Sequence, residues 1–365
     1  MSASAAFAQN AELAESEEAL LEQAENHMEN ADYQEAAGLF SQLLSLHTDE
    51  PYFRYKYAAC LIYLNQDIDK AIEYLNIAKS QKNYPQINYY LGLAYHLQYM
   101  FDKALRHYNQ FDKDALPRSE RDKYPVKRQV KMAKNGKKLV EYAYVPDIIA
   151  RKSLELDDFY YSYNLDGMGG KFIKKLESLQ TRYDRKHEKN PIVFISEAND
   201  KMMFSSYGRR GNTGKDIYFA DRNADGSWGE PYKLDYPVNT VEDDAYPYLH
   251  PDGKTLYFCS KGHNSMGGYD IFVSEYNENQ GSWGIPKNMD FPINSPLDDL
   301  LYINDQDNDI AIFASNRDSE SPRVSVYKTR VNKDPEKREV ESLKDLRNIS
   351  KLDINLLAGD MKQRD

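Results

Sequence analysis

Apolar and small residues recur at helical spacing over residues 12–112, in units of about 34 residues. In the clearest unit, Gly92 and Ala104 are small residues at positions where two paired helices would cross. Tyr95 and Tyr108 are placed to fill the adjacent space. The alanines Ala36, Ala71 and Ala104 recur 35 and 33 residues apart. A helical period nested in a longer repeat predicts stacked helical hairpins.

The pattern changes to short Tyr, Phe, Val and Ile runs from residue 142, separated by Asp-Gly, Asn and Pro clusters. Two long segments then align at a period of 54–55 residues. Phe204-Ser205-Ser206 returns as Phe258-Cys259-Ser260 and Phe313-Ala314-Ser315; Ser227-Trp228-Gly229 returns as Ser282-Trp283-Gly284; Pro237-Val238-Asn239 returns as Pro292-Ile293-Asn294. Strand, turn and strand, repeated in this way, predict one antiparallel sheet per unit.

The recurring tryptophans, Trp228 and Trp283, are each followed by glycine. We expect each of them to pack as an apolar wedge between neighbouring sheets, because a repeated architecture needs the same contact at each junction. The segment 158–172, with its paired glycines, is a candidate for a further, degenerate unit.

These two repeats resemble known families. The first resembles tetratricopeptide repeats, and the second, with its Pro251-Asp252-Gly253-Lys254 turn before a strand, resembles the WD40-like repeats of TolB-type β-propellers. The order of the two is similar to envelope proteins of Bacteroidota, related to PorE-like and OmpA-family proteins, although no OmpA-like domain follows the blades here. The resemblance implies a multidomain α + β fold, a helical solenoid followed by a complete or partial β-propeller. Residues 142–331 make about 3.5 units, whereas closed propellers use roughly 4–8 blades.

The predicted division of the chain follows from these patterns. The boundaries are 1–11 for a signal-peptide remnant or disordered tail, 12–116 for the helical repeats, 117–141 for a basic capping helix or linker, 142–331 for the blades and 332–365 for a helical tail. In that tail Leu343, Leu346 and Ile349 have helical spacing, which predicts a short amphipathic helix. The basic segment is interpreted as a solvated helix face; binding of an acidic partner or lipid headgroups is its functional alternative.

Composition narrows the function. A net charge of −11 argues against binding to nucleic acid, and no apolar run is long enough for a transmembrane helix. At the N-terminus, Ala6 and Ala8 match a small-x-small cleavage pattern, so export to the periplasm is expected, with peripheral association with the outer membrane. An ordinary Ala-rich tail is the alternative. Cys60 and Cys259 fall in different predicted domains and are not expected to pair.

Candidate chemistry is sparse, and we expect neither an enzyme nor a cofactor. Asp221, Asn223 and Asp225 match the first half of a calcium loop, but Tyr232 stands where the bidentate Glu is needed. A polar hairpin turn is therefore the preferred interpretation of this segment.

The leading hypothesis is a scaffold that binds other envelope proteins through both repeat surfaces. Resemblance to the family places Arg54, Tyr57, Tyr89 and His96 in the groove of the solenoid. The competing hypothesis is a ligand-binding propeller for a glycan or small molecule. Arg209, His263 and Arg317 follow the Phe-x-Ser strands at nearly equal offsets, which would gather them on one face or make all three structural loop residues.

Overall fold

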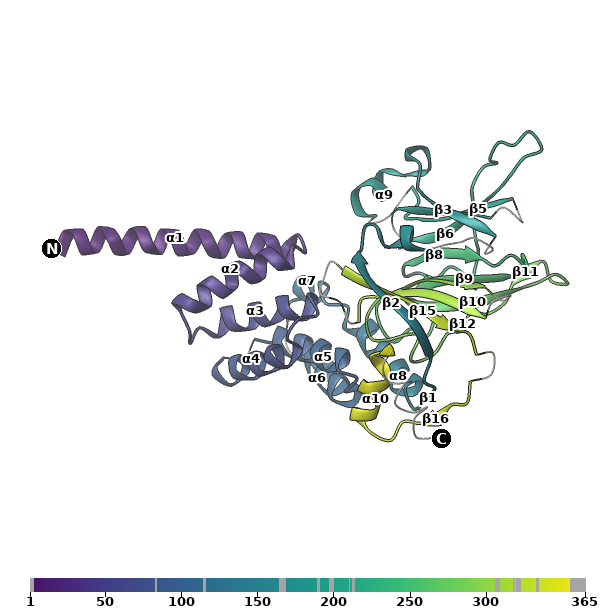
Figure 1. Cartoon of the computed structure of the whole chain (residues 1–365). Coiled ribbons are helices and arrows are strands. Elements are labelled where there is room, and N and C mark those ends of the chain that lie inside the picture. Colours follow the sequence, from purple (N-terminus) through teal and green to yellow (C-terminus); the bar gives the residue numbers. More distant parts are fainter. Residues whose placement is uncertain are drawn as a thin grey trace. The chain divides into compact units, whose positions relative to one another are not determined.

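The structure is a computed structural model that divides the chain into two compact units, residues 1–131 and 132–365 (Figure 1). It describes residues 3–354 apart from 83, 114–115, 164–168, 189–190, 197–199, 210, 212–213, 306–308, 318, 320–322 and 333–334; side chains are described from Ser16 onward. The division falls inside the segment predicted as a linker.

The first unit consists of consecutive helical hairpins. Its helices are α1 (Ala3–Glu29), α2 (Tyr33–Leu46), α3 (Pro51–Tyr63), α4 (Ile68–Gln81), α5 (Gln86–Leu97), α6 (Phe101–Lys113) and α7 (Arg118–Arg121); α8 (Val126–Leu139) runs across the division of the chain. From α1 to α6 each helix packs on the next, and the tightest packing is within the pairs α1–α2, α3–α4 and α5–α6. This arrangement fits the tetratricopeptide interpretation.

Small residues permit the close approach of α5 and α6, as predicted. Ala104 is fully buried, and a Cβ added to Gly92 would overlap the ring of Tyr108, which is itself fully buried. The equivalent contact between α1 and α2 uses Ala24 and Ala36 in one apolar cluster. Helical periodicity and small residues at the crossings therefore account for the first unit.

The second unit contains three main antiparallel sheets. The first orders β3 (Gly170–Lys174), β4 (Ile192–Ser196), β5 (Lys201–Ser206), β6 (Asp216–Asp221) and β7 (Tyr232–Lys233); the second is built from β8 (Asp244–Leu249), β9 (Thr255–Ser260), β10 (Asp270–Asn277), β11 (Ser282–Trp283) and β12 (Lys287–Asn288); the third orders β13 (Asp299–Asp305), β14 (Ile310–Ser315), β15 (Arg323–Arg330) and β2 (Asp147–Glu155). A small ribbon pairs β1 (Tyr142–Ala143) with β16 (Arg338–Glu339). Short helical segments are η1 (Phe159–Ser162), η2 (Glu177–Leu179), α9 (Arg182–His187) and α10 (Leu343–Ser350).

The 54–55-residue repeat corresponds to one sheet per unit. The Phe-x-Ser segments form β5, β9 and β14, and each phenylalanine pairs with an aromatic residue on the following strand. Strand β8 packs against β4, β5 and β6, and β13 packs against β8, β9 and β10. The predicted helical region followed by a sheet-rich region is confirmed.

Two strands have positions that the repeat did not predict. Strand β2 precedes the first sheet in sequence, yet it pairs along its length with β15 and completes the third sheet. The segment 158–172 does not form a sheet of its own among the described residues. Instead, Gly170 begins β3, which pairs with β4 at the edge of the first sheet. The expectation of a separate degenerate unit is therefore wrong.

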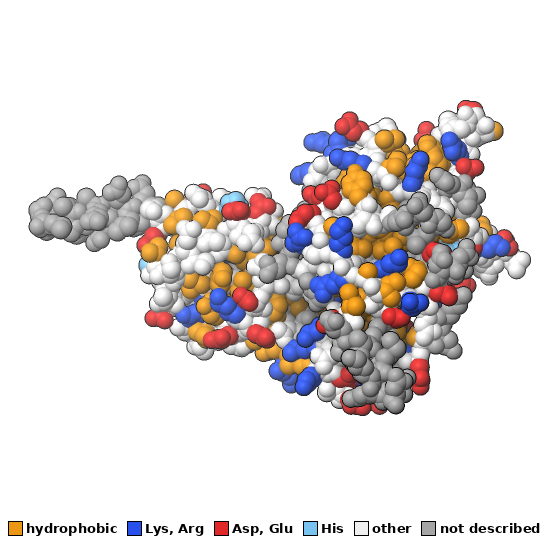
Figure 2. Space-filling view, viewed as in Figure 1, with side chains coloured by type: hydrophobic (Ala, Val, Ile, Leu, Met, Phe, Trp, Pro, Cys, Tyr) orange, Lys and Arg blue, Asp and Glu red, His pale blue; other side chains and the backbone are white. Residues whose placement is uncertain are grey.

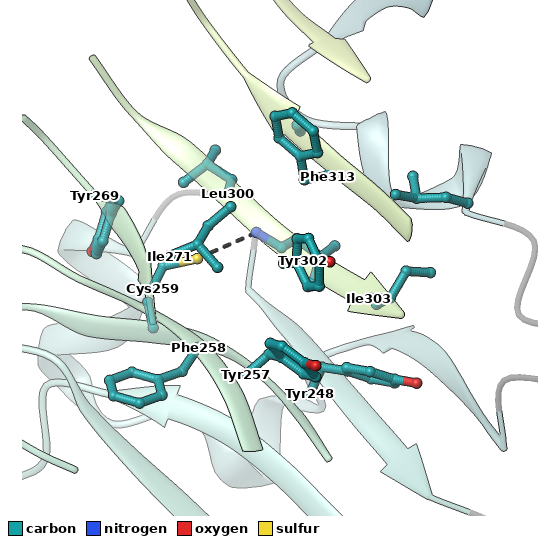
Figure 3. Packing of buried hydrophobic residues seen from close by; sticks show 14 of the residues in the cluster. Tyr248, Tyr257, Phe258, Cys259, Tyr269, Ile271, Leu300, Tyr302, Ile303 and Phe313 are labelled. Atoms are coloured by element: carbon teal, nitrogen blue, oxygen red, sulfur yellow. Dashed lines mark hydrogen bonds between the residues drawn. The ribbon is translucent and has the colours of Figure 1, made fainter. Parts of the chain in front are cut away.

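Residues from all three sheets meet in one apolar core (Figure 3). Between the second and third sheets, Ile271 and Cys259 face Leu300 and Tyr302, and the Leu301 amide donates to Cys259 Sγ at 3.2 Å. Cys60 and Cys259 are both buried and lie in different units. Their thiols are free, as expected.

The repeated Pro-x-Asn segments join successive sheets. Asn239 Oδ1 accepts from the Ile217 amide at 2.7 Å, and its Nδ2 donates to the Ile217 carbonyl at 3.0 Å. Asn294 makes the same two bonds to Ile271, at 2.7 and 2.9 Å. One buried amide side chain therefore anchors the connection that leads from each sheet to the next.

The C-terminal segment forms the predicted short helix, α10. Leu346 and Ile349 of α10 are buried, and Leu352 joins the apolar core of the sheets. No helix in the described part of the chain is both long and apolar enough to cross a membrane. On the face seen in Figure 2, acidic and basic side chains are interspersed with apolar ones.

Candidate functional site

A pocket of about 420 Å³ opens between the first two sheets, where β7 and β11 lie. Its apolar lining includes Phe219, Tyr232, Tyr236, Tyr276 and Trp283. Phe219 is buried at 2% exposure, whereas Tyr232 and Tyr236 are 42% and 80% exposed. A pocket of this size with several aromatic walls is typical of a binding site.

The β10–β11 hairpin places Trp283. Tyr276 pairs with Trp283 across this hairpin, and their ring centroids are 5.2 Å apart in an edge-to-face arrangement. Trp283 also meets the edge of Phe219, from the first sheet, at 6.3 Å. Trp283 therefore lies between the first two sheets, where a wedge was expected, and it is half-buried and also lines the pocket.

Trp228 has the same place in the repeat but a different environment. It packs on an apolar cluster of the first sheet that contains Val193, Met202 and Phe204, and the Arg222 guanidinium lies over its ring. Among the described residues, no aromatic ring of another sheet contacts Trp228 as Phe219 contacts Trp283. The predicted role between sheets is wrong for Trp228.

The opposite wall of the pocket comes from β7. Phe219 pairs with Tyr232, and their ring centroids are 6.3 Å apart. Burial, together with the charge of the Asp221 carboxylate and its hydrogen bond to the phenol, raises the pKa of Tyr232 to about 12. The phenol is therefore a neutral hydrogen-bonding group at physiological pH.

The lysines of the pocket are ion-paired. Lys233 Nζ lies 2.7 Å from Asp216 Oδ2, and Lys201 Nζ bonds to Asp221. Opposite charges at this range largely compensate each other, so the pocket combines aromatic surface with two compensated lysines and the exposed carboxylate of Asp235.

His263 and Arg317 occupy equivalent positions and perform equivalent structural tasks. His263 Nε2 lies 3.1 Å from the Val238 carbonyl oxygen, and Arg317 donates to the carbonyls of Pro292 and Ile293. Val238 and Ile293 are the middle residues of the two Pro-x-Asn segments. His263 and Arg317 therefore share a position in the repeat because each bonds to the segment that joins its sheet to the preceding one. This agrees with the alternative that they are structural loop residues.

Arg317 is unsuited to binding a partner in this structure. Its side chain is 3% exposed and forms a buried ion pair with Asp299, whose side chain is fully buried. Arg209, at the matching place in the first sheet, is exposed. The hypothesis that Arg209, His263 and Arg317 form one ligand-binding face is therefore wrong for Arg317, because its guanidinium is committed to the fold.

The groove residues expected in the helical unit differ in exposure. Tyr89 and His96 are 3% and 4% exposed, so their predicted place on a groove surface is wrong; both pack on Tyr108 in the helical core. Arg54 donates to Gln81 Oε1 at 2.8 Å and to the Thr48 carbonyl. Tyr57 is half-buried against Tyr74, at 6.1 Å between centroids.

Sequence reasoning missed a tyrosine cluster in the helical unit. Its members contact one another through their rings: Tyr33, Tyr52, Tyr55, Tyr63, Tyr84, Tyr89, Tyr90 and Tyr124. Tyr63 remains 39% exposed, and Tyr52 donates to Glu25, which also binds Lys56 at 2.6 Å. The high tyrosine count was a signal for this cluster, but its assembly depends on the packing of several helices.

A buried ionic network beside the first sheet was also missed. Lys175 Nζ lies 3.2 Å from Asp184 Oδ2 and 2.9 Å from Glu188 Oε2, and all three side chains are nearly inaccessible. Glu188 also lies 3.5 Å from Lys215 Nζ, and burial lowers the pKa of Lys215. These groups compensate one another's charge, which is the condition for keeping ions in a protein interior.

The half calcium loop forms an exposed turn. Asp225 Oδ1 accepts from the amide and hydroxyl of Ser227, at 2.9 and 2.6 Å, and Asn223 Nδ2 donates to the same hydroxyl. Asp221 bonds to Lys201. Within the described residues, no group of three or more metal-binding side chains is gathered at one point.

Comparisons with known proteins add little to this description. No protein-family model matches the chain, and no curated protein matches it. A solved structure similar to part of the chain is the TPR domain of Sgt2 from Aspergillus fumigatus, at 21% identity. The match covers 33% of this chain and 77% of that one, with a TM-score of 0.27.

Proposed function

We propose that the chain is a non-catalytic protein-interaction scaffold in which the sheet unit offers the principal binding surface. The observation that carries this proposal is the pocket beside Trp283, where Tyr232 and Tyr236 remain exposed while the neighbouring lysines are ion-paired. Tryptophan and tyrosine dominate binding energy at protein interfaces, because they bury a large area with few rotatable bonds.

The tyrosine cluster supports a second surface in the helical unit. Tyr63 and Tyr52 combine apolar rings with polar tips, and such residues are enriched at wet interfaces. Stacked helical hairpins present an extended face on which several rings act together.

We further propose that the sheet unit is of the β-propeller type and that the protein works in the bacterial envelope. The propeller proposal is supported by the pairing of β2 with β15. Strand β2 precedes the first sheet in sequence but completes the third sheet, so the two ends of the sheet unit share one sheet. Export is supported by the Ala6 and Ala8 pattern and by the resemblance of the repeats. The side chains of Ala6 and Ala8 lie outside the described ones. Cell fractionation with sequencing of the mature N-terminus tests this: recovery in the cytosol with Met1 retained refutes export.

Site-specific photo-cross-linking tests the scaffold function. A photoreactive phenylalanine analogue replaces Tyr236 in the living cell, and the matched control replaces Tyr161, which is 67% exposed and does not line the pocket. We expect a discrete protein adduct from position 236 and none from position 161. Equal labelling at both positions, or no protein adduct at position 236, would contradict the proposal.

A further inference from the structure

We propose that the pocket between the first two sheets binds a proline-rich segment of the partner in the polyproline II conformation. This inference rests on the proposed scaffold function and specifies the chemistry of the partner at the same pocket. Proline-rich segments dock in grooves lined by aromatic side chains, because the pyrrolidine rings fit between flat aromatic walls and the ligand is already ordered before binding.

The rings of the pocket form such walls. Trp283 and Tyr276 meet at an interplanar angle of 68°, and Trp283 and Phe219 at 76°, so the indole stands between two rings set nearly perpendicular to it. Tyr232 and Tyr236 border the same space and are accessible. Phe219, nearly fully buried, provides an apolar floor.

The hydrogen-bonding groups of the pocket complement a ligand that has many acceptors and few donors. The indole N–H of Trp283 and the hydroxyls of Tyr236 and Tyr276 can donate to a ligand, whereas the Tyr232 hydroxyl bonds to Asp221. A proline residue has a backbone carbonyl but no N–H, so a proline-rich segment offers acceptors without donors. Asp216 and Asp221 bind the two lysines of the pocket, and Asp235 is the carboxylate among the lining residues.

Two other occupants suit the pocket less well. An added β-strand needs a long edge, yet β7 and β11 each contribute two residues. A glycan presents hydroxyls that donate as well as accept, and Asp235 is the one carboxylate among the lining residues. Gly253 and Gly281 line the pocket at hairpin turns, so no side chain closes the rim there.

Intrinsic fluorescence provides the test, because the chain contains two tryptophans. Trp228→Phe leaves Trp283 as the single reporter, in the full-length protein. The probe is an oligoproline peptide of about nine residues, three turns of polyproline II helix. A Gly/Ser peptide of the same length and a chitin oligosaccharide serve as comparison ligands. Tyr236→Ala and Tyr161→Ala are introduced separately; both tyrosines are largely exposed, so folding should be unaffected.

We expect a saturable change in Trp283 emission with oligoproline, weakened about tenfold by Tyr236→Ala and unchanged by Tyr161→Ala. No response to oligoproline, an equal response to the Gly/Ser peptide, or a response to the oligosaccharide alone would overturn the inference. A protein adduct at position 236 combined with a silent oligoproline titration would overturn this inference and leave the scaffold function standing.

Discussion

Individual side chains at the helix crossings set how closely the helices of the first unit approach. Gly92 lies against the ring of Tyr108 with no room for a methyl group, whereas a Cβ at Gly38, on exposed α2 surface, would meet no atom within 4 Å. A side chain is therefore excluded by packing at position 92, whereas position 38 has room for one.

Gly92→Ala should lower the free energy of unfolding by about 2 kcal/mol, because overpacking outweighs the gain in helix propensity. Gly38→Ala should raise it by about 0.5–1 kcal/mol, because only the propensity term remains. Chemical denaturation followed by circular dichroism measures both. If both variants change the free energy of unfolding in the same direction, the close contact between Gly92 and the Tyr108 ring is contradicted.

Asp244 links stability to pH. It is inaccessible to solvent and accepts from the Thr240 amide and hydroxyl at 2.6 and 3.0 Å, yet burial raises its pKa to about 7. Between about pH 4 and pH 7 the folded protein therefore holds a proton that the unfolded chain has lost. The free energy of unfolding contributed by this group consequently falls as the pH rises through that window.

Asp244→Asn should remove this contribution, so the loss of stability between pH 5 and pH 8 becomes smaller by about 2 kcal/mol than in the unaltered protein. Denaturant titrations at the two pH values give the difference. An unchanged pH dependence would show that Asp244 titrates at an ordinary value.

At the scale of elements, one offset in the repeat serves three different environments. Arg317 is buried with Asp299, His263 bonds to a backbone carbonyl, and Arg209 is exposed in the first sheet. The burial and bonding of the side chain at this repeated position therefore differ from sheet to sheet.

Alanine substitutions at these three positions should give a graded series. Arg317→Ala should cost about 3 kcal/mol, since it leaves a buried carboxylate uncompensated. His263→Ala should cost about 1 kcal/mol, and Arg209→Ala less than about 0.5 kcal/mol. Thermal and denaturant unfolding measure the series; equal costs at all three positions would refute the structural account of the offset.

Strand β2 offers a test of how the third sheet is completed. Ile148 is 2% exposed in the common core, whereas its neighbour Ile149 is 36% exposed. Ile148→Ala should destabilise the sheet unit by about 3 kcal/mol and Ile149→Ala by less than about 0.5 kcal/mol. Equal effects in an unfolding titration would mean that β2 does not pack as described.

Sequence periodicity was sufficient to predict the helical hairpins, the sheet repeats and the docking helix around Leu346, because each depends on local spacing. Pairing of β2 with β15 is not local: it joins residues about 175 positions apart and leaves no periodic trace. The pocket beside Trp283 likewise needs two sheets to meet. Tyr89 and His96 were misplaced because groove and core positions alternate along one helix.

At the scale of the whole molecule, the buried charges hold the fold and the accessible aromatic rings are available for binding. Lys175 and Arg317 are paired inside the sheet unit, while Tyr232 and Tyr236 stand open at a pocket between sheets. This separation supports the proposed scaffold function.

Hydrogen exchange footprinting of the chain with its cross-linked partner tests that assignment most directly. The account predicts that amides of residues 232–236 and 281–283 gain protection together, because both segments border the pocket. The exposed turn around Asp225 serves as the internal reference and should exchange equally with and without the partner. Protection confined to other segments, with residues 232–236 and 281–283 unchanged, would contradict the proposed binding surface.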